Sequence, residues 1–172
     1  YKGKTDAEIV RMLELSTLHH EITHKAQELN GIDCALEDHF GLPDELWERM
    51  GVDFRESVNT ELAAYLGEMI TSENPSTVLL HLMLHFLAGG VSLENFVVAR
   101  YLYNTLDGRK KEDWLDWGNA REVVGLFLKL SEKPELVRER AEALYEKAYP
   151  GLKVVDRAMM GLVAALFGRK QI

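Results

Sequence analysis

The sequence predicts an all-α fold, and two observations carry that prediction. Apolar residues recur at helical spacing along most of the 172 residues, whereas no run alternates between apolar and polar residues for long enough to form a convincing strand. Glycine, proline and asparagine separate the helical stretches and act as turn signals. The expected helices cover residues 6–29, 43–49, 53–71, 76–88, 92–106, 118–132, 134–148 and 152–167.

The first expected helix is also the longest. Thr5 and Glu8 form a T-x-x-E capping box at its start, and no proline or glycine interrupts the chain before Gly31. Its apolar residues fall on two nearly opposite faces, so we expect this helix to be central to the domain. One face carries Ile9, Leu13, His20 and His24, and the other carries Leu15, Leu18, Ile22 and Leu29.

The second long helix follows a long irregular stretch of the chain. A D-x-x-E pattern at Asp53 and Glu56 predicts its N-terminal cap. Apolar residues then recur at helical spacing, and Glu61 lies about 60° around the helix from Val58, at the margin of the apolar stripe. Glu68 shares the face of Glu61 two turns later. A carboxylate at this margin faces the boundary of the core more than the solvent.

The later helices are expected to pack on these two. The apolar run over residues 77–91 is too short to span a bilayer, so it predicts a buried helix and no membrane span. The charged segment 135–147 predicts an exposed amphipathic helix. We expect a helical core over residues 1–90 and a helical extension over 91–172 packed on it, and the two halves could equally form one continuous domain.

The motif with the clearest chemistry lies inside the first helix. His20, Glu21 and His24 form the pattern H-E-x-x-H. Residues four apart share one helical face, so both imidazoles can reach a single metal ion. Glu21 projects about 100° around the helix from His20, where it can bond a water molecule that the metal activates but is poorly placed to be a ligand. The pattern therefore predicts two zinc ligands and a general base.

A catalytic zinc needs a third protein ligand, because its tetrahedral site holds three protein donors and one water molecule. The best candidate is Glu61 on the second long helix. Glu68 is the substitute candidate, and Glu56 is a weaker one.

These residues resemble those of a known family. The string LHHEITHKAQELNG, followed by TELAAYLGE, resembles zincin metallopeptidases of the gluzincin type, in which a second helix supplies a glutamate in an E-x-x-A or E-x-x-S context. The resemblance covers residues 14–70, less than half of the chain. It implies that His20, His24 and Glu61 bind Zn²⁺, that Glu21 activates the water molecule, and that the substrate is a peptide or a protein.

The chain departs from that family in two respects. Zincins place a β-sheet before the motif helix, with an edge strand that holds extended substrate, whereas few residues precede the motif helix here. The sequence also does not identify the residue that would stabilise the oxyanion. These departures lead us to expect either a piece of a longer protein that lacks upstream strands, which a first residue of Tyr1 instead of Met favours, or a helical variant with an altered substrate cleft.

The composition narrows the classes of partner. A net charge of −8 argues against nucleic-acid binding. Cys34 is the only cysteine, which excludes an internal disulfide and a cysteine-based zinc site. A lone cysteine is compatible with a reducing cytoplasm, where we expect the protein to reside.

Two other functions compete with a zinc metallopeptidase. One is a non-catalytic helical interaction module, a degenerate zincin that keeps the motif without the activity. The other is an all-α nucleotide pyrophosphohydrolase, in which helix-borne acids hold magnesium around a triphosphate. That chemistry requires clustered E-x-x-E and E-x-x-D acids, and Ala64 stands where the partner of Glu61 would be.

Overall fold

The computed structural model describes residues 3–30, 34–36, 39–88, 92–114 and 119–152. The prediction of an all-α fold is confirmed, since these residues form seven α-helices, two short 3-10 helices and no strand. The expected helix over 152–167 lies outside the described residues from position 153 onward. The elements are α1 (Asp6–Asn30), η1 (His39–Gly41), α2 (Asp44–Arg49), α3 (Gly51–Thr71), α4 (Ser76–Ala88), α5 (Leu93–Asp107), η2 (Lys111–Asp113), α6 (Ala120–Ser131) and α7 (Pro134–Ala148).

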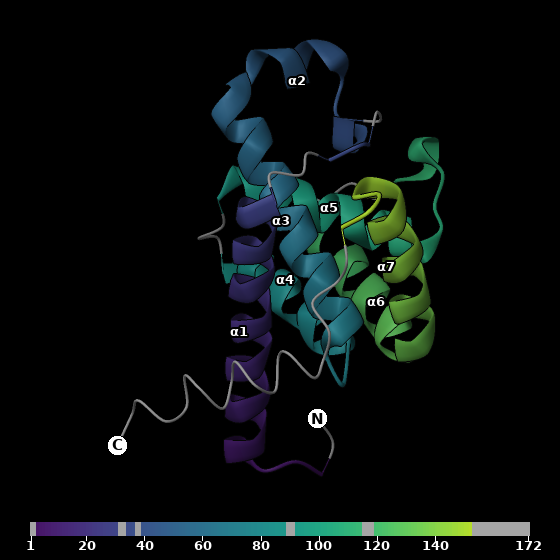
Figure 1. The fold of residues 1–172 in the computed structure, drawn as a ribbon. Helices are drawn as coiled ribbons and strands as arrows, with labels where there is room; N and C mark the ends of the chain where they lie inside the picture. The colour runs from purple at the N-terminus through teal and green to yellow at the C-terminus, as the bar shows by residue number, and fades with distance from the viewer. Residues whose placement is uncertain (1–2, 31–33, 37–38, 89–91, 115–118, 153–172) are drawn as a thin grey trace.

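The central helix is α3. Every residue from Leu62 to Met69 is buried, and α1, α5 and α7 all pack against this helix. Figure 1 shows α1 running alongside α3, with α7 on the other side of it. The helices α4, α5 and α6 pack against one another and complete the bundle.

The H-E-x-x-H helix is less central than the sequence predicts. On α1, Leu15 is 39% exposed and Val10 is 53% exposed. Only one side of this helix meets α3, and its described buried residues are Ser16, His20 and Thr23. Helical periodicity identifies an apolar face but does not say whether another element covers it.

Small residues on α3 allow α1 to approach closely. Gly67 faces Thr23 so tightly that a β-carbon added at Gly67 would lie 2.6 Å from the Thr23 hydroxyl oxygen. One turn later, the Thr71 hydroxyl lies 3.1 Å from Nδ1 of His19. The contact between the two helices therefore brings the motif of α1 onto the buried stretch of α3.

The starts of the two long helices differ in how well the sequence predicted them. The capping box of α1 is present, with the Thr5 amide donating to Glu8 at 2.7 Å and the Glu8 amide donating to the Thr5 hydroxyl at 3.3 Å. The D-x-x-E cap expected for α3 is wrong, because this helix begins at Gly51 and Asp53 lies inside its first turn. Gly51 has φ of 79°, a left-handed conformation that lets the chain turn from α2 directly into α3.

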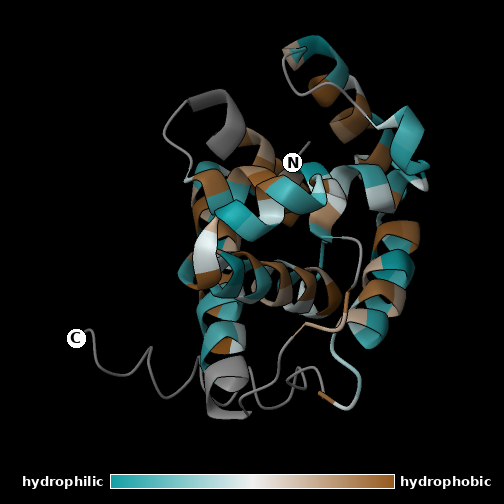
Figure 2. Ribbon diagram, turned by 90° about the horizontal axis from the view of Figure 1, so that it is seen from above, coloured by the Kyte–Doolittle hydropathy of each residue, from teal (hydrophilic) through white to brown (hydrophobic). Residues whose placement is uncertain are grey.

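The hydrophobic core contains side chains from residues both before and after position 90, the boundary expected between core and extension. Buried tyrosines tie distant elements together through their hydroxyl groups. Tyr103 of α5 donates to the carbonyl of Leu79 at 2.6 Å, and Tyr149 donates to the carbonyl of Asn59 at 2.6 Å. Figure 2 shows hydrophobic and hydrophilic residues on different sides of the helices, as packing around a shared core requires. In the part of the chain that the structure describes, no helix combines the length and the hydropathy that a membrane crossing needs.

Candidate metal centre

The structure brings His20, His24 and Glu61 together between α1 and α3. The Nε2 atoms of the two imidazoles lie 2.9 Å apart. The carboxylate of Glu61 lies beside both of them, with Oε2 at 3.3 Å from His20 Nε2 and Oε1 at 3.7 Å from His24 Nε2. Glu61 sits at the margin of the buried stripe of α3, where its helical position placed it, and its side chain is 24% exposed.

These separations fit a tetrahedral metal site. Zinc bonds imidazole nitrogen and carboxylate oxygen at about 2.0–2.1 Å, so two ligand atoms of one tetrahedral zinc lie about 3.3 Å apart. The separations of 2.9, 3.3 and 3.7 Å lie close to that value, although the last two end on different oxygens of Glu61. Each residue offers a donor atom within 4.8 Å of the other two donors. The residues present therefore fit a zinc ion without rearrangement of the helices.

The electrostatics of the two histidines differ. Burial alone lowers the pKa of His20, but hydrogen bonding to Glu61 and Glu68, together with their negative charge, outweighs burial and raises this pKa to about 9. Burial and the adjacent His20 lower the pKa of His24, while Glu61 and Glu21 oppose this shift. The raised pKa of His20 favours a ring whose proton a metal would have to displace, whereas the lowered pKa of His24 favours the neutral ring that binds a metal.

A buried carboxylate lies behind His20. Glu68 is fully buried, and its Oε2 lies 3.5 Å from Nδ1 of His20, on the ring edge away from Glu61. Burial raises the pKa of Glu68. The hydroxyl of Ser16 donates to the other oxygen of this carboxylate. Glu68 is thus not placed as the substitute ligand that the sequence suggested, since it faces the nitrogen that does not point at the cluster.

Two more residues position His20, and the sequence offered only weak signals for them. Ser16 lies one helical turn before His20 and so shares its face. Tyr65 packs its ring against the imidazole, with ring centroids 4.4 Å apart, and its hydroxyl donates to Oδ1 of Asn95 at 3.2 Å. Tyr65 lies one turn after Glu61, where a tyrosine would ordinarily be assigned to packing. The contact with Tyr65 restricts how the His20 ring can turn, and Ser16 acts on this ring through its hydrogen bond to Glu68.

An open pocket lies directly beside the cluster. Its volume is about 400 Å³, and two of the residues that line it, His24 and Glu61, are candidate ligands. Glu56, the weaker candidate ligand, lines this pocket and is not part of the ligand cluster. The side chain of Glu21 is exposed and is not among the lining residues, although its charge acts on His24.

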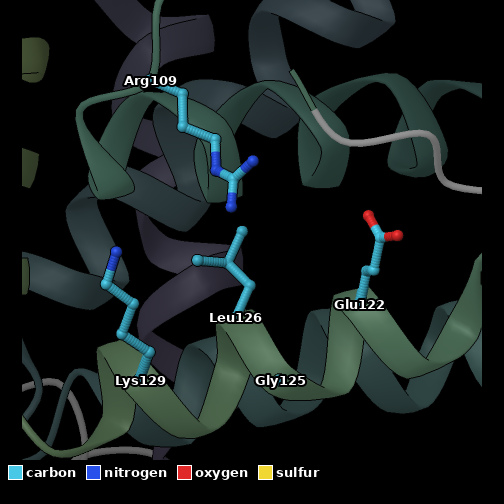
Figure 3. Close-up of a pocket in the computed structure, with 5 residues that line it drawn as sticks. All are labelled: Arg109, Glu122, Gly125, Leu126 and Lys129. Atoms are coloured by element: carbon cyan, nitrogen blue, oxygen red, sulfur yellow. The ribbon is translucent and has the colours of Figure 1, made fainter. Parts of the chain in front are cut away.

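A second pocket, of about 300 Å³, lies on α6 (Figure 3). Arg109, Lys129 and Glu122 point into the space above Leu126. Both cations pair with Asp107, at 3.0 Å from Arg109 and 2.5 Å from Lys129. Asp107 therefore neutralises part of the charge of Arg109 and Lys129. The pocket is for this reason a weaker candidate for a binding site than the metal cluster.

Comparison of the chain with protein-family models, with curated proteins and with solved structures finds no match. The chemistry of the centre therefore follows from its own residues. The imidazoles of His20 and His24 and the carboxylate of Glu61 lie close together. The buried carboxyl group of Glu68 lies behind His20, and a polar pocket lies beside the cluster.

Proposed function

We propose that this chain is a zinc-dependent metallopeptidase. One observation carries the proposal, namely the convergence of His20, His24 and Glu61 at tetrahedral spacing beside an open pocket. The H-E-x-x-H pattern and its resemblance to gluzincins support the same activity.

The donor set favours zinc over magnesium and calcium, and the H-E-x-x-H pattern favours zinc over iron, which two histidines and a carboxylate also bind. Magnesium and calcium prefer sites made of oxygen ligands, whereas two imidazoles and a carboxylate form the donor set of a zinc hydrolase. The same donor set disfavours a nucleotide pyrophosphohydrolase, which would gather carboxylates around magnesium.

The arrangement is that of a catalytic site more than a structural one. Structural zinc sites are closed by four protein ligands, whereas catalytic sites keep one position for water or substrate. Among the described residues the cluster offers three ligands, and His24 and Glu61 border a pocket that is open to solvent. A pocket of this size can hold a side chain of a peptide substrate.

The proposed reaction is hydrolysis of a peptide bond. Zinc at this site would lower the pKa of a water molecule and polarise the scissile carbonyl. Glu21 would accept a proton from the water molecule and pass it to the leaving amine. Its negative charge already acts on His24, which supports a position close to the reaction. Glu68 and Ser16 would hold the His20 ring so that Nε2 faces the cluster.

Zinc stoichiometry tests the proposal. The protein would be purified without a chelator or a metal-affinity tag and measured by elemental mass spectrometry beside His20→Ala and Glu61→Ala. His39→Ala is the matched control, because His39 lies outside the cluster and pairs with Asp44 at 3.1 Å. We expect about one zinc per chain, lost in His20→Ala, weakened in Glu61→Ala and retained in His39→Ala.

The opposite result is equally informative. If the protein holds no zinc even after zinc is added back, the metallopeptidase proposal fails and a non-catalytic helical interaction module becomes the better interpretation.

A further inference from the structure

We propose that the pocket beside the metal ligands selects peptide substrates with a basic side chain next to the scissile bond. This inference rests on the proposed peptidase activity and adds the substrate class to it. The basic side chain would be that of a lysine or an arginine.

The wall of the pocket is polar and acidic. Beyond His24 and Glu61, it is formed by Asp53, Glu56, Ser57 and Thr60. Among the described residues that line the pocket, none is a lysine, an arginine or a large apolar residue. A hydrophobic side chain would find no large apolar surface there, and the carboxylates would repel an acidic one, whereas an ammonium or guanidinium group would find two carboxylates and two hydroxyl groups.

The two carboxylates of the wall are available to a ligand. Neither Asp53 nor Glu56 forms an ion pair or a side-chain hydrogen bond with another residue that the structure describes. Their neighbour Arg55 directs its Nε to the carbonyl of Gly51 at 3.3 Å. A cation entering the pocket would therefore not have to displace an existing partner.

Acidic residues on a surface do not by themselves identify a ligand. The position of Asp53 and Glu56 does point to a ligand, because the same pocket is lined by His24 and Glu61, two of the three candidate metal ligands. A peptide placed with its scissile carbonyl at the cluster would run past the acidic wall. The pocket and the metal centre are thus parts of one site.

The spacing along α3 sets how far a substrate side chain must extend to reach the wall. A helix rises about 1.5 Å per residue, so Glu56 lies about 7.5 Å and Asp53 about 12 Å along the axis from Glu61. An extended peptide advances about 3.3–3.6 Å per residue. Asp53 projects about 80° and Glu56 about 140° around α3 from Glu61, so a basic side chain close to the scissile bond has to extend along and around this helix to reach them.

Binding of matched peptides tests the inference without depending on turnover. The probes are two fluorescently labelled peptides that differ only in arginine or citrulline beside the central bond, each with a free or an acetylated N-terminus. Citrulline has the shape of arginine without its charge. Dissociation constants would be measured by fluorescence anisotropy on zinc-loaded Glu21→Gln protein, and cleavage by mass spectrometry on the zinc-loaded chain with Glu21 intact.

The variants for this test are Asp53→Asn, Glu56→Gln and their combination. The matched control is Glu139→Gln, which removes one exposed carboxylate from α7, away from the pocket. We expect the arginine peptide to bind about three- to fivefold more tightly per carboxylate at low ionic strength. The combined variant should lose this preference, Glu139→Gln should keep it, and acetylation of the N-terminus should not change it.

The other outcomes separate the two proposals. Cleavage without any preference for arginine, or a preference that survives in the combined variant, overturns the inference and leaves the peptidase proposal standing. A preference abolished by acetylation assigns the cation to the peptide N-terminus and overturns the side-chain assignment. A second zinc per chain that disappears in the combined variant shows that the wall binds metal and also overturns it. A charge preference without cleavage overturns the peptidase proposal but supports the cation pocket, and absence of both overturns both.

Discussion

Glu68 lies directly behind His20, with its Oε2 3.5 Å from Nδ1 of the imidazole, while Nε2 of the same ring faces Glu61 at 3.3 Å. One imidazole is therefore placed between two carboxylates, of which one is fully buried and the other reaches the pocket. The separation between His20 Nδ1 and Glu68 Oε2 is slightly longer than a normal hydrogen bond, and it places the Glu68 carboxylate where the second ring N–H of His20 can donate to it. Metal-ligating histidines commonly donate their second ring N–H to a carboxylate in this way.

Replacement of Glu68 tests this relationship. Glu68→Gln keeps the size of the side chain but removes its negative charge, so the His20 ring should be held and polarised less well. We expect zinc affinity to fall about 10- to 100-fold, measured by competition with a chromophoric chelator. Glu73→Gln, which alters an exposed carboxylate beyond the end of α3, is the control and should bind zinc normally. Unchanged affinity in Glu68→Gln, with the fold intact by circular dichroism, would show that Glu68 is only a buried packing residue.

Replacement of Glu21 separates metal binding from catalysis. Glu21 is exposed and is not part of the ligand cluster, so Glu21→Gln should retain zinc. Loss of the base should lower kcat/KM by about 10²- to 10⁴-fold. The comparison requires equal zinc content in both preparations, checked by elemental mass spectrometry. Full peptidase activity in the zinc-loaded variant would exclude Glu21 as the base.

Much of the fold could be predicted because neighbouring residues signal where a helix begins and ends. The capping box at Thr5 and the turn at Pro75 depend on neighbouring residues, and the observed bounds of α1 and α4 agree closely with the expected ones. The start of α3 was misplaced because a positive φ at Gly51 lets that helix begin without a side-chain cap. Gly51 in the sequence does not reveal which conformation it adopts.

The candidate site was predictable to a similar extent. The i, i+4 spacing of His20 and His24 fixes their common face, and the helical position of Glu61 places it at the edge of the core. The role of Glu68 was not predictable, because a helical face does not reveal which ring nitrogen of a facing histidine a carboxylate will meet. Helical periodicity also does not say how α1 lies against α3. It therefore could not show that the acidic wall at Glu56 lies beside the metal ligands.

The stability of the metal-free protein should depend on pH through His20. Its pKa in the folded state is about 9, above the value of about 6.5 for an unperturbed histidine. A raised pKa means that the folded state binds the proton more tightly, so this stabilisation is fully present below about pH 6.5 and is lost as the pH rises through about 9. The raised pKa of Glu68 acts in the same direction.

Chemical denaturation of the metal-free protein at pH 6.5 and pH 9.5 measures this effect. The free energy of unfolding should fall between the two values in the wild-type chain, and the fall should be smaller in His20→Gln, which has no proton to lose. An equal fall in both proteins would mean that other groups cause it.

The close contact between α1 and α3 should couple stability to metal binding through Gly67. A β-carbon at this position would lie 2.6 Å from Oγ1 and 2.8 Å from Cγ2 of Thr23, the residue just before His24 in the motif. Gly67→Ala should therefore push the two helices apart and cost about 1–3 kcal/mol of unfolding free energy.

The same separation should weaken zinc binding, because His20 and His24 lie on α1 whereas Glu61 lies on α3. Adding Thr23→Ala removes both of the closest atoms, so the double variant should recover part of the stability and part of the zinc affinity. Gly125→Ala is the control on α6, where an added β-carbon meets nothing within 4 Å. Denaturant unfolding and chelator competition on all four proteins would measure both quantities. Loss of stability in Gly67→Ala without loss of zinc affinity would show that the cluster tolerates a wider spacing of the two helices than the measured ligand separations imply.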